Sequence, residues 1–380
     1  MELAPPKRGP GKRSTVNASS ENQPEPDHLP RVGVVVIGRN EGERLVRCLR
    51  SVVANSRQQN EHPTDEPLTA GERPVVYVDS NSTDGSALRA QELGADVVNL
   101  DTTRKFTAAR ARNAGLARLL ERHPNLDFVQ FLDGDCELDP AWMEVAETFL
   151  RNQPDHAVAC GRRRERFPER SIYNRLCDLE WDTPVGPRAS CGGDAMIRVD
   201  ALRAVSGYRE SLIAGEEPEM CFRMRELGYR VMRLPAEMTL HDAAMFRFGQ
   251  WFQRCRRAGH ASAEMAALHG KHRERAGVRP VLRALFWGLA WPLTALSVGV
   301  WLGPGPGVAM VLLGYGYVFW RSYGSERRVG GRSAADARLY AAACVLSKVP
   351  EVVGVFTYVM NRVRNRPSTL LEYKSKVIGT

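Results

Sequence analysis

Two aspartates separated by one residue form the part of this sequence best suited to chemistry. Asp133 and Asp135 directly follow the apolar run at 128–132 in FVQFLDGDCELDPAWM. The backbone turns at a strand end, so neighbouring carboxylates can converge there. Converging carboxylates repel each other unless a cation lies between them, and Mg or Mn serves this purpose where substrate phosphates complete the coordination. The pair predicts a divalent metal site, although a solvated turn before a helix would carry the same residues.

A second acidic cluster opens the segment GEEPEMCFRMRELGYRV, which is predicted to be a helix ending near Gly228. Its glutamates are Glu216, Glu217 and Glu219. Acidic residues in the first turn of a helix offset the positive end of its dipole, which is a purely structural role. A carboxylate there also stays ionised, so the cluster can equally include a general base. The apolar residues expected to face inward are Met220, Phe222, Met224 and Leu227.

The elements that must position these acids are predicted to form an α/β sheet. Continuous Val-rich runs at 31–38 and 74–80 are typical of strands buried on both faces of a parallel sheet. Shorter strands are expected at 97–100 and 157–161, and apolar residues at helical spacing separate the first strands. This alternation predicts a parallel sheet covered by helices, which the run at 128–132 closes.

Polar residues at the strand ends extend the candidate site. Asp79 ends the second run, and ligands of open α/β sheets bind beyond the carboxyl ends of the strands. The segment RKFTAARARNAGLAR offers basic side chains to phosphates, although solvated surface arginines would show the same pattern. These basic residues are Arg104, Lys105, Arg110 and Arg112.

Composition limits the class of protein without deciding its function. The chain has 380 residues, a formal charge of +9 and a pI near 9.3, so an anionic partner is expected: nucleic acid, a phosphorylated substrate or an acidic membrane face. Eight cysteines without CxxC spacing favour a reduced cytosolic setting with no zinc site. No apolar secretory signal opens the chain, residues 1–30 read as a disordered tail, and 55–74 reads as a surface insertion.

In their order, these motifs resemble the family 2 glycosyltransferases over residues 31–245. Members of that family have the GT-A fold, a Rossmann-like, mostly parallel sheet flanked by helices. They transfer a sugar from a nucleotide-diphosphate donor to an acceptor hydroxyl with inversion. The resemblance implies that the nucleotide sugar is bound by Glu41, Asp79, Arg112, Asn113 and Asp133. One departure is Ser80, which stands where the family has a second acidic residue.

The resemblance also implies a metal site and a base. Asp133 and Asp135 match the metal-binding D-x-D, and His241 in MTLHDAAM matches a further metal ligand, so Mg or Mn is expected.

GEEPEMCFRMRELGYR aligns with the family pattern GEDxDLxxRLRxxGYR, in which the second acid is the general base. That position is Glu217 here, and Glu216 and Glu219 are the rival candidates. The QxxRW signature of processive relatives is not met by QWFQRC at 250–255, so processive synthesis is not expected.

The C-terminal third predicts attachment to a membrane. Aromatic and basic residues interleave in FRFGQWFQRCRR, so 246–280 is expected to lie in a membrane interface; no RNA-binding signature accompanies the stripe, and no nucleic-acid partner is expected. Residues 281–363 are expected to form membrane-associated helices, followed by a tail at 364–380. A buried helical subdomain is the alternative.

Three apolar stretches make up the membrane region. Residues 284–302 are uncharged and would span about 28 Å as a helix, which is close to the hydrocarbon thickness of a bilayer. After a turn at 303–307, residues 308–320 return over only about 20 Å, which fits a hairpin inserted from the cytosolic side. The third stretch, 339–360, either crosses with a kink or lies in the interface.

The sequence therefore predicts a membrane-attached, metal-dependent inverting glycosyltransferase at the cytoplasmic membrane, with its catalytic domain facing the cytosol. Its expected partners are a nucleotide-sugar donor, a glycan or lipid-linked acceptor of cell-surface polysaccharide synthesis, and the membrane. A nucleotidyltransferase, which would release pyrophosphate instead of a nucleoside diphosphate, is one alternative. A membrane scaffold that has kept the fold and lost turnover is the other.

Overall fold

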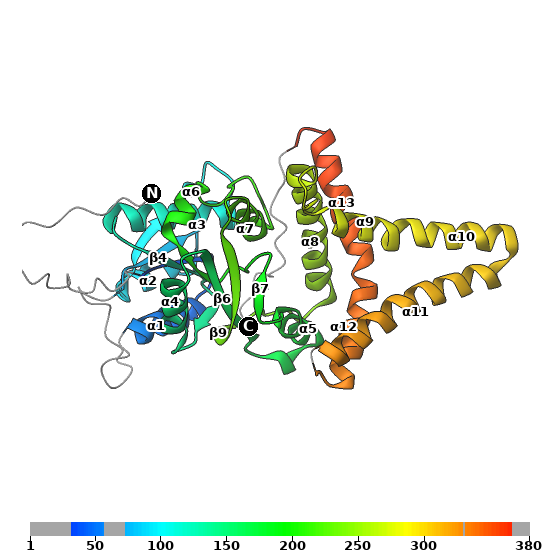
Figure 1. Ribbon diagram of the computed structural model, residues 1–380, viewed down its shortest axis with the longest axis horizontal. Coiled ribbons are helices and arrows are strands. Elements are labelled where there is room, and N and C mark those ends of the chain that lie inside the picture. The colour runs from blue at the N-terminus through cyan, green and yellow to red at the C-terminus, as the bar shows by residue number, and fades with distance from the viewer. Residues whose placement is uncertain (1–31, 57–72, 330, 367–380) are drawn as a thin grey trace, which may run out of the picture.

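The computed structural model describes residues 32–56, 73–329 and 331–366. A sheet with flanking helices occupies one end of the molecule, and a group of long helices occupies the other (Figure 1). The tail predicted at 1–30 lies outside the described residues, as do most of the insertion at 55–74 and most of the tail at 364–380.

One half of the sheet is parallel and follows the predicted alternation of strands and helices. Its strands run in the order β3-β2-β1-β4. Strand β1 is buried on both faces over six residues, as its Val-rich sequence predicts. The elements of this half are β1 (Val32–Gly38), α1 (Glu43–Ser56), β2 (Val75–Asp79), α2 (Ser86–Glu92), β3 (Asp96–Asn99), α3 (Ala108–Arg122) and β4 (Phe128–Asp133).

The other half of the sheet is mixed, and β4 joins the two halves. The prediction that residues 128–132 close the sheet is wrong, because β4 pairs antiparallel with β8, where Phe131 lies opposite Ala195. A strand buried on both faces needs hydrogen-bonding neighbours along both edges, and the segment after residue 190 supplies the second neighbour. The remaining strands are β5 (Cys136–Leu138), β6 (His156–Glu165), β7 (Gly186–Arg188), β8 (Ala195–Arg198) and β9 (Arg230–His241).

Shorter helices surround the mixed half. Helix α7 begins with the acidic cluster and buries Met220, Phe222 and Met224 as predicted, whereas Leu227 is exposed because the helix ends there and Gly228 turns the chain away at φ 91°. The helices of this region are α4 (Trp142–Asn152), the 3-10 turn η1 (Pro168–Arg170), α5 (Ile172–Trp181), α6 (Val199–Ala204) and α7 (Glu216–Glu226).

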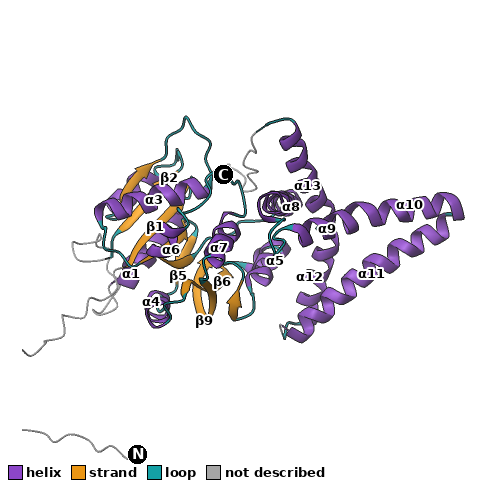
Figure 2. Cartoon of the chain, turned by 45° about the horizontal axis from the view of Figure 1, so that its top comes forward, coloured by secondary structure: helices purple, strands orange, loops and turns teal. Residues whose placement is uncertain are grey.

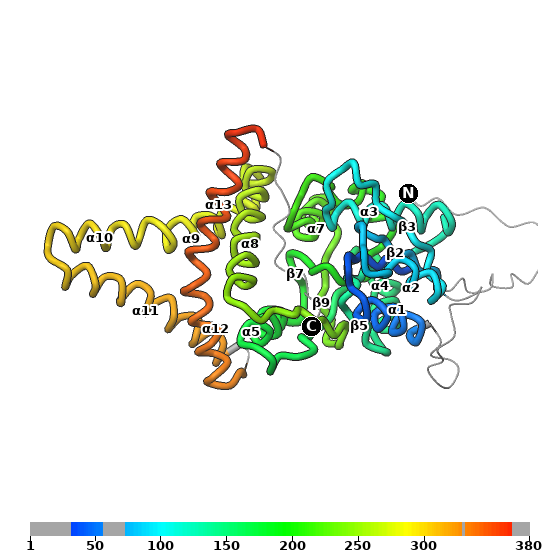
Figure 3. The backbone as a smooth tube through the Cα atoms, turned by 180° about the vertical axis from the view of Figure 1, so that it is seen from behind, coloured from blue at the N-terminus to red at the C-terminus, as the bar shows by residue number. Residues whose placement is uncertain are grey.

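The C-terminal helices form a separate layer beside the sheet domain. Helices α8, α12 and α13 lie next to the sheet domain, and α10 and α11 project away from them as a hairpin in all three views (Figures 1, 2 and 3). The bounds are α8 (Phe248–His269), α9 (Val278–Leu285), the π-helical turn η2 (Phe286–Ala290), α10 (Trp291–Leu302), α11 (Pro304–Val329), α12 (Ala334–Leu346) and α13 (Lys348–Val363).

Two stretches of this layer, Val278–Leu302 and Ala334–Val363, are long and apolar enough to cross a membrane. The turn expected at 303–307 is confined to Gly303, at φ 96°, because proline fits the first turn of a helix and α11 already begins at Pro304. Helix α11 therefore has 26 residues, far more than the apolar return stretch at 308–320.

Helix α3 approaches the sheet closely because Gly115 has no side chain. A Cβ at Gly115 would lie 2.4 Å from Val35 Cγ1 and 2.9 Å from Val78 Cγ2, in strands β1 and β2. At the start of the helix, Thr107 accepts a hydrogen bond from the Arg110 backbone N–H at 3.1 Å. These two features fix the depth and the direction of the helix that carries Arg112.

We expect Gly115→Ala to lower the free energy of unfolding by about 1 to 3 kcal/mol, because the methyl group forces α3 away from a packed sheet. Thermal unfolding of the full chain in detergent measures the effect. Gly249→Ala is the matched control: Gly249 also lies in a helix but has nothing within 4 Å of an added Cβ. The control should be neutral or stabilising by up to about 1 kcal/mol. Equal unfolding temperatures for the two variants would contradict this account of α3.

Candidate active site

The ends of the parallel strands bring the first group of predicted residues to one edge of the sheet. Ile37 pairs with Asp133, and Gly38 pairs with Asp79, so β1, β2 and β4 end side by side. Glu41 follows β1 by three residues and forms an ion pair with Arg44 at 2.8 Å. The carboxyl ends of parallel strands are where ligands of such sheets bind, so this edge is the candidate site.

Asp79 is almost completely buried and both of its oxygens accept hydrogen bonds. The Tyr77 hydroxyl donates to Oδ1 at 3.0 Å, and the Ser82 backbone N–H donates to Oδ2 at 2.7 Å. Burial and the Asp79 charge raise the pKa of Tyr77, which keeps its hydroxyl a donor. The turn after β2 is therefore held by Asp79, and this turn forms one wall at the strand ends.

Strand pairing brings Asp135 and His241 together. Strands β5 and β9 are antiparallel with Cys136 opposite His241, so the residue before β5 lies beside the last residue of β9. His241 Nε2 lies 3.3 Å from Asp135 Oδ2, and both side chains are buried. The Nδ1 atom of His241 has no hydrogen-bond partner and lies 3.9 Å from Glu165 Oε2. The edge of the ring faces Trp181, at 4.6 Å between ring centroids.

Arg112 joins the two acidic clusters through a single guanidinium group. Its Nη2 lies 2.8 Å from Asp133 Oδ1, and its Nη1 lies 3.0 Å from both Glu216 Oε1 and Glu217 Oε1. The Arg112 side chain is only 2% exposed. A buried cation requires carboxylate partners, so the interaction holds α3, β4 and α7 in one arrangement. Gly193 leaves room for the ion pair of Arg112 with Asp133, because a Cβ at this position would lie 2.7 Å from Asp133 Oδ2.

The three glutamates of α7 differ in their surroundings. Burial and the neighbouring Glu216 raise the pKa of Glu217 to about 7, against the opposing effect of Arg112. Glu219 is fully buried and contacts Arg223 at 2.8 Å, Arg209 at 3.1 Å and His269 at 3.1 Å.

Burial alone would raise the pKa of Glu219, but Arg223, His269 and Arg209 outweigh it and hold the pKa below its usual value. Glu219 is a structural anion, whereas Glu217 is poised to exchange a proton near neutral pH.

A second arginine, Arg163, also binds Asp133. Its Nη2 lies 3.3 Å from Asp133 Oδ2 and 2.6 Å from Asp194 Oδ2. Asp194 is completely buried, accepts a hydrogen bond from the Asp133 backbone N–H at 3.1 Å, and accepts another from the Thr239 hydroxyl at 2.9 Å. The Arg163 guanidinium also lies over the Trp181 ring, 5.5 Å from its centroid. Sequence reasoning missed this group because Arg163 lies in β6, Asp194 directly precedes β8 and Thr239 lies in β9.

The other members of the basic segment mainly organise loops. The Asn113 side chain donates to the Tyr208 carbonyl and accepts from the Tyr208 N–H, both at 2.8 Å. Arg110 donates to the Asp101 carbonyl at 2.7 Å and the Arg104 carbonyl at 2.9 Å. These contacts anchor the loops before α3 and after α6.

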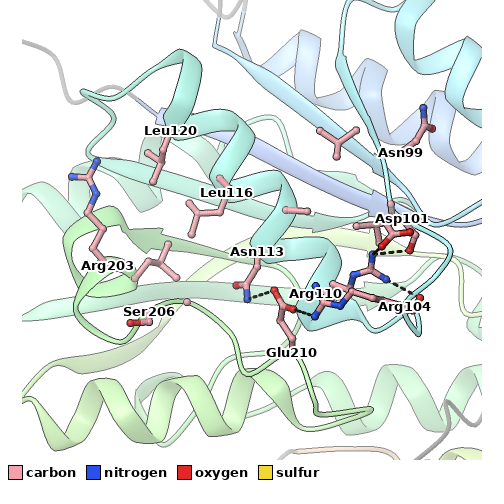
Figure 4. A pocket seen from close by; sticks show the side chains of 16 residues that line it. Asn99, Asp101, Arg104, Arg110, Asn113, Leu116, Leu120, Arg203, Ser206 and Glu210 are labelled. Carbon is pink, nitrogen blue, oxygen red and sulfur yellow. Dashed lines mark hydrogen bonds and ion pairs between the residues drawn. The ribbon is translucent and has the colours of Figure 1, made fainter.

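The same residues line a cavity of about 600 Å³ along α3 (Figure 4). In the close-up, Asn113 and Arg104 point toward Glu210, and Arg110 points toward Asp101. The lining includes Asn113 but neither Glu217 nor Asp133. The candidate site is therefore marked by its charged groups and not by this cavity.

The residues present fit a divalent cation. Oxygen and nitrogen atoms of Asp135 and His241 lie within 4.8 Å of one another in one buried group, and Asp133 and Asp194 belong to an adjoining group that shares Cys136. Burial and the charge of Asp194 raise the pKa of Cys136, so its thiol stays protonated and is a poor ligand. The carboxylates and the imidazole are the fitting ligands, and such a set suits Mg or Mn.

Comparisons with known proteins bear on the family and the fold of the chain. Residues 33–202 match the family model described as Glycosyl transferase family 2. The succinoglycan biosynthesis protein ExoA of Rhizobium meliloti is 27% identical over 72% of this chain and 83% of its own length. The pre-mycofactocin glycosyltransferase of Mycobacterium tuberculosis is 28% identical, over 51% of this chain and 43% of that protein.

A solved structure has a similar fold. It is the mannosyltransferase PcManGT from Pyrobaculum calidifontis in complex with GDP-Man and Mn2+, which superposes with a TM-score of 0.52 at 18% identity. The superposition covers 88% of this chain and 89% of that structure.

Two substitutions in α7 should change stability in opposite directions at pH 8. The depressed pKa of Glu219 means that its stabilising contribution is present above its unfolded pKa and is lost in acid. Glu219→Gln should therefore lower the free energy of unfolding by about 1 to 3 kcal/mol, because it removes the shared anion of Arg223, Arg209 and His269, which are themselves partly exposed.

The raised pKa of Glu217 means that its contribution is present below about 4.5 and is lost as pH rises through about 7. Glu217→Gln should raise the unfolding temperature at pH 8 and have little effect at pH 5. Thermal unfolding of both variants at the two pH values, without added metal, measures this. If Glu217→Gln lowered the stability at pH 8, the ionised Glu217 carboxylate could not be destabilising the folded protein as we infer.

Proposed function

Because the chain is a family 2 glycosyltransferase with a GT-A fold, we propose that it transfers a sugar from a nucleoside-diphosphate sugar to a hydroxyl of a glycan or lipid-linked saccharide, with inversion. The proposal rests on one observation: Asp133 and Glu217 both form ion pairs with the guanidinium group of Arg112. A donor-binding carboxylate and a candidate base are thereby placed within reach of one substrate. The catalytic unit is assigned to residues 31–245.

The donor lies at the ends of the parallel strands in this proposal. Glu41 and Asp79 border the nucleoside, and Arg112 and Arg163 attract the diphosphate oxygens, because guanidinium groups bind phosphate through paired hydrogen bonds. Asn113 acts indirectly by fixing the backbone at Tyr208. The PcManGT complex with GDP-Man supports a donor of this chemical class.

Asp135 and His241, with Asp133, would hold Mg or Mn. When bound, the cation supplies Lewis-acid stabilisation of the charge that develops on the departing nucleoside diphosphate. Glu165 Oε2 lies 3.9 Å from His241 Nδ1. Glu165 is itself held in place, because its Oε1 accepts a hydrogen bond from the Asn174 amide at 3.1 Å and its Oε2 accepts one from the Ala243 N–H at 3.0 Å. A carboxylate fixed beside the second ring nitrogen orients a ligating histidine.

Glu217 accepts the proton of the acceptor hydroxyl as that oxygen attacks the anomeric carbon. A base with a pKa of about 7 is well matched to neutral pH, because about half of it is ionised there and it is basic enough to take the proton. Attack on the face opposite the leaving group inverts the stereocentre in one displacement. Glu219 is excluded from this role by its three cationic partners, and Glu216 lies deeper, with 5% of its side chain exposed against 13% for Glu217.

The C-terminal layer attaches the enzyme to the cytoplasmic membrane with the catalytic domain in the cytosol. The membrane-associated helices are assigned to 281–363. Most of the segment 246–280, which the sequence predicts to be interfacial, forms α8, and α8 lies between α13 and the sheet domain. Two stretches long and apolar enough to cross a membrane support the attachment. The similarity to ExoA, whose name places it in succinoglycan biosynthesis, supports a role in cell-surface polysaccharide synthesis.

Glu217→Gln should reduce kcat for sugar transfer by about 10²- to 10⁴-fold, which is the usual contribution of a general base. The affinity for the metal–donor complex should change little, because the amide keeps the size of the side chain and contacts the acceptor side. Donor turnover with a panel of UDP, GDP and TDP sugars and binding by calorimetry measure the two quantities. Full activity in this variant would remove Glu217 from the mechanism.

In the native enzyme, kcat/KM should rise with pH through a limb near 7 as Glu217 loses its proton. The limb should disappear from the residual activity of Glu217→Gln. A limb that persists unchanged in the variant would mean that another group is titrating. Release of a nucleoside diphosphate, and not of pyrophosphate, separates sugar transfer from nucleotidyl transfer.

Loss of a residue that only orients a metal ligand usually weakens metal binding by roughly 10- to 100-fold. Asp135→Asn and His241→Ala remove a proposed ligand itself, so each should weaken metal binding by more than this. The paramagnetic signal of free Mn measures this affinity, and chelation by EDTA should abolish transfer in the native enzyme. The matched control is Asp84→Asn, because Asp84 accepts a hydrogen bond from the Ser86 hydroxyl at 2.7 Å before α2 and lies outside the metal groups. Equal Mn affinity in all three variants would contradict the proposed ligands.

A further inference from the structure

The hairpin of α10 and α11 exposes an apolar surface that no other part of the described chain covers. Residues 284–320 contain no charged side chain. Both helices present large hydrophobic residues to the outside, with exposures from 51% to 84%: Leu293, Leu296, Val300, Trp301, Leu302, Val308, Leu312, Leu313, Tyr317 and Trp320. Exposed apolar surface of this extent marks contact with another apolar phase.

Arginines surround the base of the hairpin, at the end nearest the other helices. Arg279 and Arg283 precede the uncharged stretch, and Arg321, Arg327 and Arg328 follow it; all five are exposed. The helices lie side by side, so both groups of arginines are at the same end, and Gly303 is at the far end (Figures 1 and 3). A bilayer with anionic headgroups matches this distribution of charge.

Helix α13, together with the last residue of α12, carries a second exposed apolar feature, a stripe along one face. It consists of Leu346, Val349, Phe356, Met360 and Val363, which recur at the spacing of one helical face. The opposite face of α13 packs on α8, which lies between the stripe and the sheet domain, whereas α12 packs on α11 and α5. The stripe therefore faces away from the sheet domain, which is also the direction in which the hairpin projects.

The close packing of α13 on α8 is incompatible with a span through α13. A Cβ at Gly354 would lie 2.0 Å from the Arg256 carbonyl, and a Cβ at Gly259 would lie 2.0 Å from the Glu351 carbonyl, so the two backbones touch. Helix α8 also carries Arg254 and Arg257. A span through α13 would draw these arginines and the ion pair of Lys348 with Glu351 into hydrocarbon, which is strongly unfavourable.

We propose that only the α10–α11 hairpin inserts into the bilayer, while α12 and α13 lie along its surface with the stripe in the headgroup layer. The occupant of both apolar surfaces is a lipid bilayer. From residue 284 to residue 302 the first helix reaches about 28 Å, so the tip at Gly303 ends in the far leaflet. The chain then returns to the side from which it entered, and the sheet domain and residues 331–366 lie on that side. This inference rests on the membrane attachment proposed above.

Depth-dependent quenching tests the division between the two surfaces. The full chain, with the half-buried Cys344 replaced by Ala, receives one added cysteine at Leu313, Val349 or Ser325 and a fluorescent label. It is added to preformed vesicles of phosphatidylcholine and phosphatidylglycerol that contain lipids with nitroxides at different depths. The label at 313 should be quenched most by a nitroxide deep in the acyl chain and the label at 349 by one near the headgroup. The label at 325 should be quenched by aqueous iodide.

A membrane-impermeant maleimide tests the topology. Cysteines introduced at Ser333 and Asn365, which flank α12 and α13, should both react from the outside of these vesicles, where the sheet domain lies. Deep quenching at 349, or protection of one of the two flanking positions, would overturn the inference and leave membrane attachment intact. Failure of the full chain to float with any vesicles would overturn the attachment itself. Sugar transfer measured in detergent is independent of both results.

Discussion

The site depends on a buried guanidinium group that is surrounded by carboxylates from two distant parts of the chain. Arg112 is 2% exposed and contacts Asp133 at the end of β4 and two glutamates at the start of α7. Without these partners the buried charge would be strongly destabilising, so folding of the sheet and docking of α7 are linked. Close packing at Gly115 and the absence of a side chain at Gly193 set the position of this cation.

The same constraint explains the chemistry of the site. Arg112 and Arg163 together face Asp133, Asp194 and the two glutamates, with Asp135 close by, so anionic groups outnumber the buried cations. Burial first, and then the negative charge of Glu216, raises the pKa of Glu217, and the excess of negative charge suits the divalent cation proposed at Asp135 and His241. One electrostatic imbalance therefore contributes both to the raised pKa of the proposed base and to the proposed metal site.

The sequence predicted those parts whose signals are local. Val-rich runs identified β1 and β2, and the position of Asp133 and Asp135 at the end of β4 identified them as candidate metal ligands. The local pattern also marked the glutamate cluster of α7 as a possible source of a base, but the choice of Glu217 within it, and His241 as a metal ligand, came only from the resemblance to a family. Arg163 and Asp194 were missed, since their meeting depends on pairing among β4, β6 and β8, which no local spacing encodes. The edge position given to β4 was wrong for the same reason.

Helix α7 is also held from its other side, by α8. His269 at the end of α8 contacts Glu219, and its ring lies 4.3 Å from that of Phe222, measured between centroids. Glu217 is therefore positioned by Arg112 from the sheet and, through its own helix, by α8 from the C-terminal layer. Helix α8 packs on α13, which carries the apolar stripe. A rotation of the C-terminal layer against the sheet would therefore move α7 and the proposed base Glu217 before it moved Asp133. The orientation of the C-terminal layer is thus part of the geometry of the site.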